Sequence, residues 1–175
     1  MIFFYRLFIN LILILSPIII LVRLFRNKED FKRFKEKIGF FKKNNSRGKL
    51  IWFHGASVGE FQSIVPMLEK FEKSNEIKKI LITSNTLSSS KIISRMKFKK
   101  VIHQFFPVDN NFIVKKFIKH WKPSIALFVD SEVWPNMIIN LTKHKIPTIL
   151  INARITKKSF KKWIKIRNFS QIIFN

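Results

Sequence analysis

The sequence predicts an α/β protein in which strands alternate with helices around a parallel sheet, preceded by a long apolar segment. Its 175 residues are enough for one compact domain, and a hydrophobic share of 47% argues against disorder. After residue 49, apolar runs of strand length alternate with stretches of helical period. Repeated strand–helix units form parallel sheets with helices on both faces. We therefore expect a Rossmann-like sheet in residues 50–175.

Residues 1–26 form a predicted hydrophobic membrane anchor. Ile2–Phe25 is almost wholly apolar and has just the length, about 20 residues, that a spanning helix needs, so spanning the bilayer and lying in it both stay open. A buried core helix is one alternative. A cleavable signal peptide is another, which the lack of a small-residue cleavage site disfavours. Many Lys and Arg residues follow, so the positive-inside rule predicts a single anchor in the inner membrane, with the domain facing the cytoplasm and anionic inner-leaflet phospholipid.

Residues 27–49 are predicted to be a basic helix and a linker. Phe31–Ile38 has the pattern of a short basic amphipathic helix that ends at Gly39. The polar stretch 42–49, with Asn44, Asn45, Ser46 and Gly48, marks the boundary between anchor and domain.

The helices and strands of the domain are predicted from the spacing of the apolar residues and from the residues that interrupt it. In the first helix, five apolar residues share one face: Phe61, Ile64, Val65, Leu68 and Phe71. The run SIALFV is typical of a buried strand, and Pro135 suits a first helical turn. The predicted strands are Leu50–His54, Lys79–Thr83, Val101–Phe106, Ser124–Val129, Thr148–Ile151 and one beginning at Ile172–Phe174. The predicted helices are Phe61–Lys73, Ser88–Lys97, Asn111–Trp121, Trp134–Lys143 and Lys157–Arg167.

The charge balance indicates an anionic partner. Lys and Arg number 34 against 10 acidic residues, a net charge of +24. Phospholipid, a phosphorylated substrate and nucleic acid all fit such a charge, as does drift towards AT-rich codons. No nucleic acid is expected, because the basic residues are scattered and form no helix-borne stripe. The chain has no cysteine and its four histidines lack metal-ligand spacing, so no metal site is predicted.

The first candidate site is the loop WFHGASVGEF, which joins the first strand to its helix. Gly55 and Gly59 are expected to permit close approaches that a Cβ would obstruct. Glu60 lies in the first helical turn, where it could act as a general base towards a sugar or lipid hydroxyl. The alternative is compensation of the helix dipole. The glycine spacing matches no nucleotide-binding loop.

Two further loops follow the fourth and fifth strands. Glu132 is a second carboxylate at the same expected sheet edge and could share a cleft and a proton with Glu60. Asp130 or Ser131 is expected to cap the following helix, and Asp109 to serve as a turn or cap residue. Arg154 could bind an anionic group, although it is also one of many basic residues. The predicted substrate-binding residues are Ser57, Gly59, Asn136, Asn152 and Arg154.

The order of the motifs resembles a known family. After a hydrophobic N-terminus come "IGFF", "IWFHGASVGE", "FFPVD", "SEVWPN" and "INARIT". Together they are similar to the N-terminal half of the transferases of 3-deoxy-D-manno-octulosonic acid (Kdo) in lipopolysaccharide synthesis. The resemblance covers nearly the whole chain. Gly55 stands where the family more often has alanine or another small residue.

The resemblance implies a fold and a reaction. The fold is GT-B, with two Rossmann-like domains facing a cleft. The donor is CMP-Kdo and the acceptor is the lipid A precursor, lipid IVA. The enzymes invert configuration and need no metal cofactor. Glu60 corresponds to the family's proposed general base, and Glu132 to a residue that supports the transition state.

One feature of the family is not found in these 175 residues. The nucleotide donor is bound chiefly by a C-terminal domain, so the chain alone is expected to be the acceptor-side half, with little or no activity. A truncated product, a fragment, and a split enzyme with a separately encoded C-terminal domain all stay open. Two other functions also stay open: another inner-leaflet glycosyltransferase, and a membrane-tethered pseudoenzyme that binds the lipid A precursor.

Overall fold

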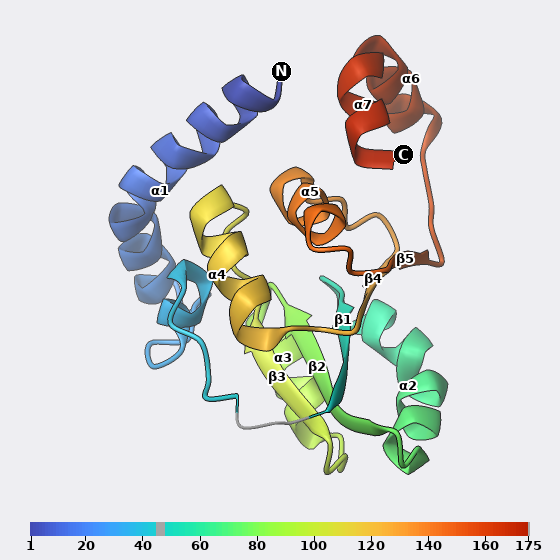
Figure 1. Cartoon of the computed structure of the whole chain (residues 1–175). Coiled ribbons are helices and arrows are strands. Elements are labelled where there is room, and N and C mark those ends of the chain that lie inside the picture. The colour runs from blue at the N-terminus through green and yellow to red at the C-terminus, as the bar shows by residue number, and fades with distance from the viewer. Residues whose placement is uncertain (45–47, 175) are drawn as a thin grey trace.

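Five parallel strands form one sheet at the centre of the molecule (Figure 1). The computed structural model describes residues 1–44 and 48–174. The strand order β3-β2-β1-β4-β5 is that of a doubly wound Rossmann sheet, so the predicted α/β class is confirmed. The strands are β1 (Lys49–His54), β2 (Ile77–Ser84), β3 (Val101–Phe105), β4 (Ile125–Val129) and β5 (Thr148–Ile151).

Helices cover both faces of the sheet. Because side chains alternate along a strand, Trp52 enters a core shared with α4 (Asn111–Trp121) and α5 (Pro135–Lys143). Its neighbour Phe53 enters a second core, shared with α2 (Val58–Lys73) and α3 (Leu87–Arg95). Both aromatic side chains are fully buried. The continuous apolar runs of the central strands therefore reflect burial on two faces.

Two sequence-based predictions about the ends of the chain were wrong. Ile172–Phe174 is no strand but the end of helix α7 (Arg167–Phe174), which follows α6 (Lys157–Lys165). Phe169 and Ile173 are buried one helical turn apart, a period that a three-residue apolar run does not reveal. The predicted helix at Phe31–Ile38 is a shorter 3₁₀ helix, η1 (Phe34–Ile38).

Residues 29–42 contact the edge strand β3. The Asp30 carboxylate accepts the backbone N–H of Lys32 and of Arg33, which turns the chain before η1. Gly39 then ends η1 with a φ of 101°, as a helix-terminating glycine does. The linker predicted at 42–49 includes residues 45–47, which lie outside the described residues, and the predicted domain boundaries stay predictions.

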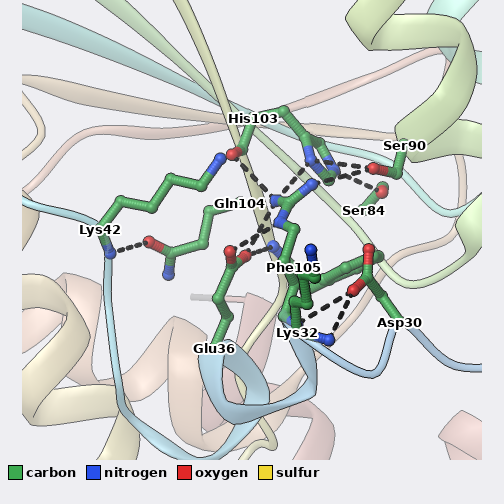
Figure 2. A network of polar contacts seen from close by, with 10 residues as sticks. Asp30, Lys32, Glu36, Lys42, Ser84, Ser90, His103, Gln104 and Phe105 are labelled. Carbon is green, nitrogen blue, oxygen red and sulfur yellow. Dashed lines mark hydrogen bonds and ion pairs between the residues drawn. The ribbon is translucent and has the colours of Figure 1, made fainter.

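The Arg33 guanidinium is the centre of this contact, and its partners Glu36 and His103 are labelled in Figure 2. Its Nε lies 2.7 Å from Glu36 Oε1, and its Nη2 lies 2.9 Å from the ring Nδ1 of His103. Burial, together with the positive charge of Arg33, lowers the pKa of His103 to about 3, so the ring is neutral and can accept this hydrogen bond. The second Glu36 oxygen accepts the buried backbone N–H of Phe105 at 2.8 Å.

We predict that Glu36→Ala destabilises the protein far more than Glu76→Ala does. Removing Glu36 leaves the Phe105 N–H without its acceptor and Arg33 without its carboxylate, a cost of about 2–4 kcal/mol. Glu76 is the matched control, because its ion pair with Lys49 is exposed and contributes less than about 1 kcal/mol. Urea unfolding in mild detergent measures both, and equal losses would contradict the prediction.

Asp109 connects the exit of β3 to the start of α5. Its carboxylate accepts the backbone N–H of Asn136 at 2.9 Å and of Met137 at 2.8 Å. It thus caps the first turn of α5, a distant helix, while Asn110 caps α4. The sequence-based expectation of a cap residue is confirmed, but the helix it caps is 26 positions further along the chain, at Pro135. Burial raises the pKa of Asp109 to about 6, and hydrogen bonds from Tyr5, Asn136 and Met137 offset only part of that rise.

This shift predicts a pH dependence of stability. An unfolded Asp carboxyl titrates near pH 4, so between about pH 4 and 6 the folded protein binds more protons than the unfolded chain. Stability therefore falls as pH rises through this range, by about 2–3 kcal/mol. Unfolding of the wild type and of Asp109→Asn across the range measures it. The substitution should remove this part of the slope, and an unchanged slope would contradict the assignment.

Candidate active site at the carboxyl ends of the strands

Glu60 lies in the first turn of α2, directly beyond the carboxyl end of β1. It forms a capping box with Ser57: Ser57 Oγ accepts the Glu60 N–H at 3.3 Å, and Glu60 Oε1 accepts the Ser57 N–H at 3.1 Å. Its other oxygen accepts the Ala56 N–H at 2.8 Å. The interpretation that Glu60 stabilises the start of its helix is therefore correct. Each carboxylate oxygen keeps a lone pair for a further partner, so capping does not exclude chemistry.

The two glycines of this loop have different roles. A Cβ on Gly55 would lie 3.1 Å from Glu60 Oε2 and 3.2 Å from the ring of Phe61, so the expected close approach is real there. At Gly59 a Cβ would meet nothing within 4 Å, and that part of the expectation was wrong. Gly59 instead borders a cavity, which a side chain at this position would narrow.

A cavity of about 220 Å³ brings most of the predicted site residues together. Its walls come from the ends of β1, β4 and β5 and the start of α2, the place where parallel sheets bind ligands. Within the described chain, the Arg154 guanidinium has no ion pair or hydrogen bond, which leaves it available to an anionic group. The lining residues are Ser57, Gly59, Glu60, Ser63, Val129, Asp130, Asn152 and Arg154.

Two polar residues of this lining, Asp130 and Ser63, were not predicted for the site. Asp130 was expected to cap α5, but the N-cap of that helix is Trp134, without a side-chain bond. A left-handed φ of 62° at Asp130 turns the chain sharply at the end of β4. Ser63 lies one turn after Glu60 and meets Asn152 at 3.4 Å. The sequence could have indicated Ser63 as a site residue, because residues three apart on a helix lie on the same face and Ser63 follows Glu60 by three.

Glu132 lines a different cavity, of about 530 Å³, walled mainly by apolar residues of α5, β5 and α7. Its Oε2 lies 3.1 Å from His54 Nε2 and accepts the Trp134 indole N–H at 2.9 Å. Burial alone would raise the pKa of Glu132, but the hydrogen bonds from His54 and Trp134 lower it below its usual value, so the carboxylate is ionised at neutral pH. The expected shared cleft and shared proton with Glu60 are absent from the described contacts.

His54 belongs to a chain of hydrogen bonds that starts inside the sheet. The Trp52 indole N–H donates to Thr83 Oγ1 at 2.9 Å, and Thr83 Oγ1 lies 3.0 Å from His54 Nδ1. An ionised Glu132 can only accept, so His54 must carry a proton on Nε2. His54 Nδ1 also lies 3.2 Å from the Thr83 backbone carbonyl oxygen, and the Thr83 hydroxyl donates to the Phe53 carbonyl oxygen at 3.4 Å. Stacking on Phe106, with ring centroids 3.8 Å apart, holds the ring in place, and His54 is fully buried.

Asn136 lies outside both cavities. Its side-chain N–H donates to the Asp109 carbonyl at 2.6 Å, and its Oδ1 accepts from Arg6 at 2.9 Å. The side chain is fully buried, so these contacts occupy it in the described structure. Among the residues with described positions, no three His, Asp or Glu side chains are grouped as metal ligands. The sequence-based expectation that the site needs no metal stays a prediction.

Comparison with known proteins assigns the family. The family model described as 3-deoxy-D-manno-octulosonic-acid transferase (kdotransferase) matches residues 32–175. The chain belongs to the Kdo transferase family. The resemblance that the sequence motifs showed is thereby confirmed.

Individual Kdo transferases agree with this assignment. The enzyme of Rickettsia bellii is 39% identical over 96% of this chain, and a probable mitochondrial Kdo transferase of Arabidopsis thaliana is 36% identical over 93%. The Haemophilus influenzae enzyme is 28% identical over 82% of the chain. The aligned part is 41%, 37% and 34% of these proteins. The chain thus spans about two-fifths of the length of these relatives.

The contact with Glu132 predicts a proton on His54 Nε2, because a carboxylate can only accept. In ¹⁵N-labelled protein, NMR of the imidazole nitrogens should show a proton on Nε2, with the signal assigned through His54→Gln. A wild-type ring protonated only on Nδ1 would contradict the proposed direction of this hydrogen bond.

Proposed function

We propose that this chain is the acceptor-side half of a GT-B Kdo transferase, which transfers Kdo from CMP-Kdo to the lipid A precursor with inversion. The observation that carries the proposal is the cavity at the carboxyl ends of β1, β4 and β5, which both Glu60 and the free Arg154 line. A base beside an anion-binding group suits an acceptor that carries both hydroxyls and phosphates.

In this proposal Glu60 is the general base. It takes the proton of the acceptor hydroxyl while that oxygen bonds to the anomeric carbon of Kdo and the bond to the CMP oxygen breaks. The amide N–H groups of Ala56 and Ser57 hold the carboxylate in one orientation, which a base needs in order to meet a hydroxyl within hydrogen-bond distance. CMP leaves as the anion, and no metal or other cofactor is required.

The remaining charged groups have supporting roles. Arg154 is proposed to bind a phosphate of the acceptor, with Ser57 and Asn152 as neighbouring hydrogen-bonding groups. Glu132, ionised and held by His54 and Trp134, is proposed to stabilise positive charge that develops on the sugar in the transition state. The donor nucleotide is proposed to bind a C-terminal domain like the remainder of the longer relatives.

The proposed location is the cytoplasmic face of the inner membrane. Ile2–Phe25 (α1) is the one described helix that is long and apolar enough to cross a bilayer, with a mean hydropathy of 2.6. The net charge of +24 suits anionic phospholipid. Such an anchor keeps the domain at the surface from which a lipid acceptor would be taken.

The capping box favours one second candidate, a pseudoenzyme that binds the lipid A precursor, because both Glu60 oxygens already accept backbone N–H groups. A chimera separates the two: residues 1–175 joined to the remaining C-terminal part of the Rickettsia bellii relative. We expect it to transfer Kdo from CMP-Kdo to lipid IVA and the isolated chain to do so weakly or not at all. Transfer from a different nucleotide sugar alone would contradict Kdo transfer, and a chimera that binds lipid IVA without any transfer would favour the pseudoenzyme.

In this chimera, Glu60→Gln should lower kcat about 100-fold or more, because the amide keeps the shape of the side chain and cannot take a proton. Part of the cap is also lost, so stability falls by about 1 kcal/mol. Thr86→Ala is the matched control: it removes the side-chain cap of α3 at a similar cost and leaves the carboxylate in place. Near-normal turnover of Glu60→Gln would leave Glu60 with the capping role alone.

A further inference from the structure

Helix α1 has two different faces along its whole length. One face is partly covered at positions that recur every three or four residues: Ile2, Tyr5, Ile9, Leu13, Ser16, Ile20 and Leu24. The opposite face is entirely apolar and at least 55% exposed at Phe4, Leu7, Leu11, Ile14, Ile18 and Phe25. The domain therefore lies beside the helix, which runs next to α4 in Figure 1, and not beyond one of its ends.

Polar contacts attach the first part of α1 to the domain. The Tyr5 hydroxyl donates to Asp109 Oδ2 at 2.7 Å, and the Asn110 side-chain N–H donates to Asn10 Oδ1 at 2.7 Å. Arg6 donates to Asn136 Oδ1 at 2.9 Å. All three contacts reach loops or helix starts at the carboxyl edge of the sheet.

The last part of α1 is attached as well. Arg23 Nε lies 2.8 Å from Glu29 Oε2, and the side chain of Glu29 is only 2% exposed. Lys37 of η1 binds the other Glu29 oxygen at 2.7 Å. Tyr5 and Arg23 are about five helical turns, or roughly 27 Å, apart, so contacts to the domain extend over nearly the full length of the helix.

A spanning orientation conflicts with these contacts. The hydrocarbon core of a bilayer is about 30 Å thick, so a helix that crossed it would carry Tyr5 and Arg6 close to the membrane surface opposite Arg23 and place Asn10 inside the hydrocarbon. Asp109, Asn110 and Asn136 are attached to them, and would enter the hydrocarbon together with the starts of α4 and α5. Such burial of a carboxylate and of loop backbone in lipid is strongly unfavourable.

We propose that α1 lies in the plane of the membrane surface, with its apolar face in the acyl boundary of an anionic phospholipid bilayer and its polar residues bound to the domain. Helices of this kind insert about 5–10 Å. The exposed basic residues that follow, Arg26, Lys28, Lys32 and Lys35, supply the complementary charge for lipid head groups. A second copy of the chain fits the face less well, because two molecules of charge +24 repel each other.

This orientation also determines where the candidate site lies relative to the membrane surface. Asp109 and Asn136, which bind α1, follow β3 and β4 at the same sheet edge as Glu60. The plane of the bilayer then runs along the edge that carries the cavity, so an acceptor that keeps its acyl chains in the membrane can present its head group there. Only this last step rests on the proposed function. The orientation of α1 does not.

Cysteine cross-linking tests the orientation, because the native chain has no cysteine. In native membranes, the pair Asn10→Cys and Asn110→Cys should form a disulfide under mild oxidation, since the two side chains are in contact. The pair Phe8→Cys and Asn110→Cys is the matched control, because Phe8 is 60% exposed on the opposite face and should not react. Equal yields from both pairs, or no disulfide in either, would overturn the proposal.

A second measurement uses the unchanged chain with a peptide tag ahead of Met1. In inside-out inner-membrane vesicles, added protease should remove the tag as readily as it digests the domain, because both lie on the same side. A tag that stays protected until detergent is added would show a spanning helix and overturn the proposal. Neither measurement depends on catalysis, so its outcome is independent of whether the chain takes part in Kdo transfer.

Discussion

All five strands run in the same direction, so their carboxyl ends lie at one edge of the sheet. The candidate functional residues lie at that edge. The chain has only ten acidic residues against 34 basic ones. Four of the ten follow strand ends: Glu60 after β1, Asp109 after β3, and Asp130 and Glu132 after β4. The parallel arrangement places these scarce carboxylates at one edge of the sheet.

Each carboxylate at this edge has its own set of donors. Backbone N–H groups hold Glu60 and Asp109, whereas a histidine and an indole hold Glu132. Among the described residues, no hydrogen bond joins Glu60 to Glu132, and a shared proton stays a prediction. The three carboxylates also have different roles. Asp109 binds α1 and α5, while Glu60 and Glu132 each border a cavity.

Local patterns predicted much of this from sequence. Five strands and the helices between them followed from period and length, because each element buries a regular set of apolar residues. The prediction of a sixth strand at Ile172–Phe174 was wrong, because three apolar residues are too few to show whether their spacing is that of a strand or of a helix. Glu60 and Glu132 line different cavities, a separation that no sequence motif indicates. The contacts of Trp52 and His54 with Thr83 join neighbouring strands that are far apart in sequence, and the polar residues of α1 find partners about 100 or more positions away.

The central claim is that the cavity beside Glu60 is where the acceptor hydroxyl loses its proton. A structure of the chain with lipid IVA bound in a lipid nanodisc tests it most directly. The account predicts a glucosamine hydroxyl within about 3.2 Å of a Glu60 oxygen and a phosphate at the Arg154 guanidinium. An acceptor head group bound in the apolar cavity beside Glu132, with Glu60 still contacting only Ala56 and Ser57, would contradict it.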